Sequence, residues 1–188
     1  MKTLTVLSSV FILFFISSFF QQKKQDEIDV IAYYSGDRNE IDDYRIEKLT
    51  HIIYSFAHLK GNKLMLDNYD AELTVKHLVS LKKKNPNLKI QIALGGWGGC
   101  ASCSGVFEKE KGRVQFAESV KKLLEKYHLD GIDLDWEYPG IEGKPQHRYI
   151  LEDKENFTKL LDFLRFSLQI CKSELGVKKL TVADIKTK

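Results

Sequence analysis

Four carboxylates lie close together in the stretch DGIDLDWEYPG, residues 130–140. Alternate residues of a β-strand face opposite sides, so Asp133, Asp135 and Glu137 are expected to share one face, with large apolar residues on the other. The Cβ atoms of such residues are only about 6.5–7 Å apart, so three carboxyl groups cannot all ionise easily away from bulk water. We therefore expect at least one raised pKa and a proton donor near neutral pH. Glu137, last in the strand, is the candidate general acid, supported by Asp133 and Asp135.

Two other interpretations of this stretch are open. An edge strand could carry an acidic, solvent-facing side, but helical patterns on both sides in the sequence favour an inner strand of a parallel sheet, buried on both faces. The carboxylates could instead bind a metal ion. Tyr138 stands where an EF-hand loop needs glycine, and Lys144 stands where it needs glutamate. A Mg²⁺ cluster is still an alternative to acid–base chemistry.

The elements that would position these residues alternate along the chain. Short runs rich in β-branched residues predict strands at residues 28–34, 50–59, 88–96, 129–138 and 178–184. Helical spacing of apolar residues lies between the later strands: Leu73, Leu78 and Leu81; Val114, Ala117, Val120, Leu124 and Tyr127; Phe157, Leu160, Leu161, Leu164, Leu168, Cys171 and Leu175. At most one helix, around residues 42–48, separates the first two strands. This order predicts a parallel α/β sheet, either doubly wound or the first part of a (β/α)8 barrel.

The N-terminus differs from the rest of the 188 residues, whose net charge of +3 gives no reason to expect nucleic acid as a partner. A lysine followed by an apolar run over residues 4–20 has the layout of a signal peptide. No clear cleavage site follows, so an N-terminal anchor is the alternative, and only an uncleaved segment would make a membrane a stable partner. We expect residues 1–20 to direct export or secretion, residues 21–27 to be a linker, and residues 28–188 to form one domain.

A glycine-rich segment, LGGWGGCASCSG, follows the third predicted strand. It lacks the G-x-G-x-x-G spacing of dinucleotide-binding loops. Cys100 and Cys103 form a C-x-x-C pair, which in an exported chain favours a small disulfide that staples the loop, with two free thiols as the alternative.

Several segments of the sequence resemble those of a known family. DGIDLDWEYPG is similar to the D-G-x-D-x-D-x-E signature, usually followed by Tyr-Pro, of family 18 glycoside hydrolases, the chitinase family. IAYYSG, THIIYSFAHL and IALGGW resemble its first three barrel strands, and the likeness extends over residues 28–184. The resemblance implies a (β/α)8 TIM barrel, hydrolysis of β-1,4 links between N-acetylglucosamine units of chitin, and neither a metal nor another cofactor.

The resemblance also implies a substrate-assisted retaining mechanism. Glu137 would protonate the leaving oxygen and later activate water. Asp135 would orient the substrate's acetamido group, which attacks the anomeric carbon, and Asp133 would share a proton or hydrogen bond with Asp135.

Other positions carry over from the family's pattern. Tyr33 would support the inner aspartate, Phe56 would line the sugar site, Trp97 would stack on a sugar ring, and Tyr138 would also contact substrate. Ala93 stands where the family commonly has a serine that holds the inner aspartate.

The length of the chain also differs from the family's pattern, because a complete barrel takes about 250 residues. We expect the barrel to be truncated after about strand five and turnover by these residues to be impaired. Two alternatives to a chitinase are an endo-β-N-acetylglucosaminidase acting on N-glycans and a non-catalytic, chitin-binding, lectin-like protein.

Overall fold

A parallel β-sheet forms the centre of the molecule. The computed structural model describes residues 28–175 and 181–182, so the predicted export segment (1–20) and linker (21–27) lie outside it. The five parallel strands, in the order in which they pair, are β1 (Ile31–Tyr34), β2 (His51–Lys60), β4 (Lys89–Gly95), β5 (Gly131–Asp135) and β6 (Thr181–Val182). The parallel sheet predicted from the sequence is confirmed. A short strand that was not predicted, β3 (Lys63–Met65), pairs antiparallel with β2.

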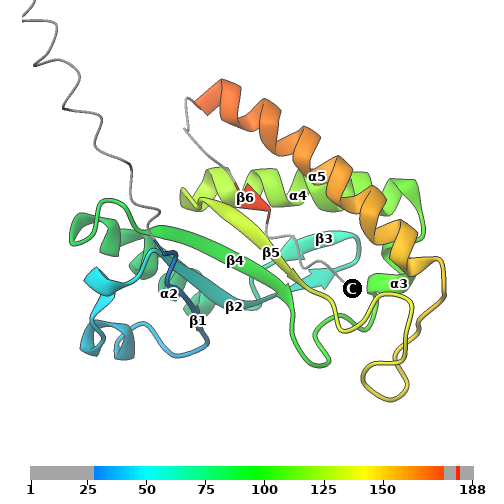
Figure 1. Cartoon of the computed structure of the whole chain (residues 1–188), viewed down its shortest axis with the longest axis horizontal. Coiled ribbons are helices and arrows are strands. Elements are labelled where there is room, and N and C mark those ends of the chain that lie inside the picture. Colours follow the sequence, from blue (N-terminus) through cyan, green and yellow to red (C-terminus); the bar gives the residue numbers. More distant parts are fainter. Residues whose placement is uncertain (1–27, 176–180, 183–188) are drawn as a thin grey trace, which may run out of the picture.

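Helices connect the strands, as Figure 1 shows. They are α2 (Tyr69–Ser80), α3 (Cys103–Phe107), α4 (Glu110–Tyr127) and α5 (Asp153–Leu175). The three helices predicted from apolar spacing are α2, α4 and α5, whereas α3 is too short for periodicity to reveal. Between β1 and β2, two 3₁₀ turns, Glu40–Asp43 and Ile46–Lys48, replace the single helix considered around residues 42–48.

One hydrophobic core lies between the helices and one face of the sheet. The strands contribute apolar residues from alternate positions, and the helices contribute their buried stripes; the chief members are Ile52, Ile90, Ile92, Leu94, Ile132, Leu134, Leu78, Phe116, Val120, Leu124, Leu160 and Leu164. On α4 the fully buried ring is Phe116, whereas the predicted Val114 is only partly covered. Because the core lies on a single face, the fold is of the barrel type and not doubly wound.

The opposite face of the sheet is concave. The Tyr33 hydroxyl on β1 donates a hydrogen bond of 3.1 Å to Oδ2 of Asp133 on β5. Three strand spacings separate β1 from β5 in the sheet order, roughly 14 Å in a flat sheet, which is beyond the combined reach of the two side chains. The sheet must therefore curl around this face, as a barrel requires.

Asp130 fixes the entry of β5. Its backbone N–H donates to the carbonyl of Ile90, and its Oδ2 accepts the N–H of the same residue, both at 2.7 Å. Lys82 Nζ lies 2.6 Å from that carboxylate. The side chain thus extends the β4–β5 ladder by one rung, ahead of the register that pairs Ala93 with Asp133. Asp130 belongs to the turn that enters the strand, as the sequence predicted.

Within the residues that the structure describes, no helix has the length and apolar character needed to cross a membrane.

Candidate active site

The three carboxylates of the signature lie at the carboxyl end of β5, where parallel α/β barrels place their active sites. Asp133 is in the strand and only 1% exposed, Asp135 is its last residue, and Glu137 follows just beyond it. The predicted strand 129–138 is therefore shorter than expected. The alternation nevertheless continues past its end, because Trp136 turns into the core.

The apolar side of this strand holds it in place. The Trp136 ring packs against Phe107, with centroids 5.5 Å apart, and against Phe157 at 6.1 Å. Ile132 and Leu134 are buried on the same side. A slip of one residue would exchange the apolar and acidic faces, so this packing fixes the register that presents the carboxylates.

Burial raises the pKa of all three carboxyl groups. For Asp133, loss of water is the largest cause; the Tyr33 hydrogen bond works against it, and the charge of Asp135 adds to it. Burial also raises the pKa of Asp135. The pKa of Glu137 is raised first by burial and then by the charge of Asp135. The electrostatic crowding expected from the sequence is therefore present, and it favours a protonated Glu137.

Tyr33 is the hydrogen-bond partner of the most deeply buried carboxylate. Burial, the charge of Asp133 and the hydrogen bond to it raise the pKa of Tyr33 to about 12, so its hydroxyl stays a donor at any ordinary pH. Ala93, beside Asp133 in the register, provides no hydroxyl.

Phe56 and Trp97 lie on neighbouring segments at this end of the sheet. The pairing of β2 with β4 shifts register between Tyr54 and Ala57, and within this irregular stretch the half-buried Phe56 ring packs against Gly96. A Cβ placed on Gly96 would lie 2.7 Å from that ring. Trp97 follows, with 60% of its surface exposed. The Trp97 side chain is therefore accessible to a ligand, whereas one side of the Phe56 ring is covered by Gly96.

The loop between β5 and α5 surrounds Glu137. It lines a small hollow together with Glu137, Tyr138 and Cys100, contributing Ile141, Gly143, His147, Arg148 and Tyr149. Arg148 anchors this loop through an ion pair of 2.9 Å with Glu108. Tyr138 is exposed at the rim. A larger hollow of about 600 Å³ runs along β1 and the 3₁₀ turns; it includes Tyr33 but none of the three carboxylates.

Cys100 and Cys103 are joined by a disulfide, with Cα atoms 5.1 Å apart, and both side chains are buried. The bond connects the loop that carries Trp97 to the first residue of α3. It therefore staples the loop, which is the arrangement favoured from the sequence.

No group of three or more histidine, cysteine or acidic side chains within residues 28–175 and 181–182 is arranged to hold a metal ion. Oδ2 of Asp133 accepts the hydrogen bond of Tyr33.

Comparison with known proteins decides the family. The sequence model of "Glycosyl hydrolases family 18" matches residues 29–184. The chain belongs to glycosyl hydrolase family 18. Among related sequences, it is 38% identical over 135 residues to an endochitinase of Manduca sexta, covering 68% of this chain and 24% of that one. It is 39% identical over 130 residues to chitinase A1 of Niallia circulans, covering 66% and 18% of the two chains. The family 18 chain thus spans about a quarter or less of these relatives.

Solved structures show the same fold. Chitinase ChiA74 from Bacillus thuringiensis superposes with a TM-score of 0.71 at 28% identity, covering 79% of this family 18 chain and 34% of the other. A family 18 N-acetylglucosaminidase from Paenibacillus barengoltzii gives a TM-score of 0.68 at 32% identity, covering 82% and 44%. These likenesses agree with a barrel-type curvature of the sheet.

Sequence reasoning did not identify two contacts at this site. His58 on β2 and Lys144 in the loop after β5 both pack against glycines of the loop that carries Trp97. His58 lies in the segment THIIYSFAHL, and Lys144 was considered only as a position of an EF-hand loop. A contact with a glycine leaves no pattern in the sequence. Only the three-dimensional arrangement could reveal them.

Proposed function

We propose that this family 18 chain carries the acid–base residues for hydrolysis of β-1,4-linked N-acetylglucosamine polymers, with chitin as substrate. The observation that supports this most directly is the row of carboxylates at the end of β5, with its gradient of burial. Asp133 is buried and hydrogen-bonded to Tyr33, whereas Glu137 lies at the rim with a raised pKa. A protonated acid within reach of a sugar bond is the requirement of glycoside hydrolysis.

The proposed reaction is substrate-assisted. Glu137 donates its proton to the leaving oxygen while the carbonyl oxygen of the substrate's acetamido group attacks the anomeric carbon. The resulting oxazolinium ion is positively charged, and Asp135 accepts a hydrogen bond from its N–H and stabilises that charge. Glu137, now ionised, takes a proton from water, and the water oxygen attacks the anomeric carbon. This opens the oxazolinium ring and gives net retention. Asp133 and Tyr33 support Asp135 from the interior.

Glu137→Gln tests the catalytic assignment. Glutamine keeps the size of the side chain but cannot donate a proton to the leaving group or act as a base. Turnover of a fluorogenic chitobioside by the 188-residue chain is expected to fall by about 10²–10⁴-fold. The matched control is Glu142→Gln in the same loop, at an exposed position, which should leave turnover unchanged. Equal and measurable turnover by Glu137→Gln and the unmodified chain would refute the assignment.

The substrate needs its own test, because the chain spans only part of its relatives. The names of the insect endochitinase and of chitinase A1 support chitin. The bacterial N-acetylglucosaminidase at 32% identity shows that family 18 structures include other cleavage patterns. Product analysis on chitohexaose and on an N-glycan separates the cases: cleavage of the N-glycan alone would indicate an endo-β-N-acetylglucosaminidase. Binding of the oligosaccharide without any cleavage would indicate a lectin-like protein.

We also propose that the chain is exported, with residues 1–20 as signal peptide or anchor and residues 21–27 as linker. The support is the apolar N-terminal run and the disulfide between Cys100 and Cys103, a bond typical of oxidising compartments. Expression with and without residues 1–20, followed by N-terminal sequencing of the secreted product, tests this. Equal secretion of both forms would count against it.

A further inference from the structure

The loop that carries Trp97 has almost no side chains with which to hold itself. Gly95, Gly96 and Gly98 all have positive φ, of 117°, 79° and 94°. The N–H of Gly99 donates to the carbonyl of Gly96 at 2.9 Å, which closes a tight turn with Trp97 inside it. Such backbone is accessible mainly to glycine, which also loses most conformational freedom on ordering. The disulfide at Cys100 secures the end of the loop, and any further support for the indole must come from other segments.

His58 holds the loop from the side of β2. A Cβ placed on Gly99 would lie 2.9 Å from Cδ2 of His58, so the imidazole edge closes off that face of the turn. The ring is held in turn by Asp67, whose Oδ2 lies 2.8 Å from Nδ1. Lys60 donates to the carbonyl of Asp67 at 3.1 Å. The histidine is thus fixed by the hairpin of β2 and β3.

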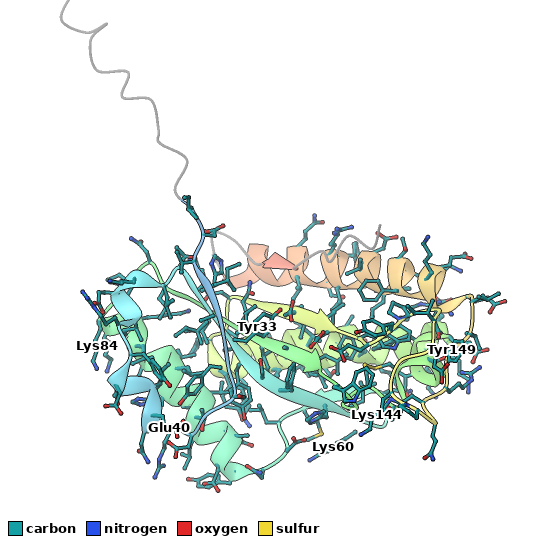
Figure 2. All side chains as sticks on the ribbon, turned by 60° about the horizontal axis from the view of Figure 1, so that its bottom comes forward. Tyr33, Glu40, Lys60, Lys84, Lys144 and Tyr149 are labelled. Carbon is teal, nitrogen blue, oxygen red and sulfur yellow. A yellow bond between two sulfur atoms is a disulfide. The ribbon has the colours of Figure 1, made fainter. Side chains whose placement is uncertain are left out.

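Lys144 holds the loop at the neighbouring glycine, Gly98. A Cβ placed on Gly98 would lie 2.6 Å from Nζ, 2.9 Å from Cδ and 3.3 Å from Cε, so the length of the lysine side chain lies along the glycine. Figure 2 shows Lys144 in the loop after β5, at the opposite end of the sheet from Lys84. The lysine is exposed, and it makes no ion pair with any residue that the structure describes. The lysine therefore contacts the loop by packing of its side chain, from Nζ to Cδ, and not through a salt bridge.

The base of Lys144 is tied to the proposed acid. Gly143, its neighbour, packs so closely on Glu137 that a Cβ there would lie 2.2 Å from the Glu137 carbonyl oxygen. One short segment therefore contacts both the backbone of the acid and the turn that presents the indole.

We propose that Lys144 and His58 are positioning residues that fix Trp97 as a flat platform for a sugar ring of the substrate. This inference rests on the proposed function for the sugar, but the positioning itself is independent of it. An indole fixed before binding avoids the loss of side-chain freedom on binding, so it gains affinity for an N-acetylglucosamine chain without any new contact. Lys144 and His58 act through Trp97, by packing on two adjacent glycines of one turn.

The test compares Lys144→Ala, Lys144→Met and His58→Ala in the full chain, with Lys122→Ala, an exposed lysine on α4, as control. The chain has two tryptophans, and Trp136 is buried, so Trp97→Phe supplies the background for a fluorescence measurement. Lys144→Ala and His58→Ala should lower the emission anisotropy of Trp97. Lys144→Met, which keeps an unbranched stem, and Lys122→Ala should leave it unchanged. A general loss of folding would not be rescued by methionine.

Affinity for N-acetylglucosamine tetrasaccharide, measured by titration calorimetry, is the second readout. It should fall about threefold to tenfold in Lys144→Ala and His58→Ala, and stay near that of the unmodified chain in Lys144→Met. Unchanged anisotropy and unchanged affinity in both alanine variants would overturn the inference. If the unmodified chain binds no tetrasaccharide, the proposed function fails, and the anisotropy alone decides whether the two residues position Trp97.

Discussion

Replacement of Asp130 tests how the strand of carboxylates is aligned. The Asp130 side chain is 12% exposed and that of Lys82 28% exposed, and the carboxylate accepts the N–H of Ile90, a residue with no exposed surface. Asp130→Ala would leave that buried N–H without a partner, at a cost of about 1–3 kcal/mol. The lost ion pair with Lys82 adds up to about 1 kcal/mol, because part of the lysine is in water. The free energy of unfolding should therefore fall by about 1–4 kcal/mol.

Asp130→Asn separates the two contributions, since asparagine keeps an acceptor oxygen for Ile90 and loses only the charge. Its cost should be about 1 kcal/mol or less. With a urea m-value of about 2 kcal/mol/M, the alanine variant should unfold about 0.5–2 M earlier in a urea titration, and the asparagine variant about 0.5 M earlier or less. If asparagine cost as much as alanine, the hydrogen bond to Ile90 would not be what secures this strand, and the reasoning would be wrong.

Three further predictions concern the site. Asp133→Asn should stabilise the chain by about 1–2 kcal/mol at neutral pH. Because the pKa of Asp133 is raised in the folded chain, the free energy of unfolding falls as the pH rises through that pKa, and asparagine removes this fall. Urea titrations should therefore show no gain in stability in acid, below the ordinary aspartate pKa. Asp135→Asn should lower the pKa of Glu137 in a ¹³C NMR titration but leave it above that of an ordinary glutamate, because burial is the larger cause; an unchanged value would contradict the stated causes. Gly143→Ala should reduce chitobioside turnover by about 10²-fold, because the added methyl group displaces the Glu137 backbone, and full activity would show that this contact can relax without effect.

The strands and long helices could be predicted because their apolar residues repeat with a clear period. The ends of the strands were harder to predict. β5 stops at Asp135, although the alternation of apolar and polar residues continues to Tyr138. The hydrogen-bonded ladder and the alternation of side-chain direction end at different residues. The hairpin of β2 and β3 was missed, although the Gly61-Asn62 pair is a recognised turn signal. Its second strand has only three residues.

The residues of the site were predicted, and among their contacts only that of Tyr33 with the inner aspartate, which came from the resemblance to the family. Asp133, Asp135 and Glu137 follow from spacing alone, whereas the reach of Tyr33 across the sheet depends on curvature, which no local pattern encodes. The contacts of His58 and Lys144 with glycines are even harder to predict from the sequence, because glycine has no side chain whose type would indicate a partner. Close approach of backbone is a property of the folded chain, and only the structure displays it.

The hydrogen bond between Tyr33 and Asp133 has a practical use. One partner is on β1, the first strand of the sheet, and the other is in its interior on β5. Any event that pairs a new strand with β1, or that lifts β1 away, would change the donor that faces Asp133. The carboxyl ¹³C resonance of Asp133 is thus a remote sensor of the edge of the sheet, and it would report assembly there without a label at the edge itself.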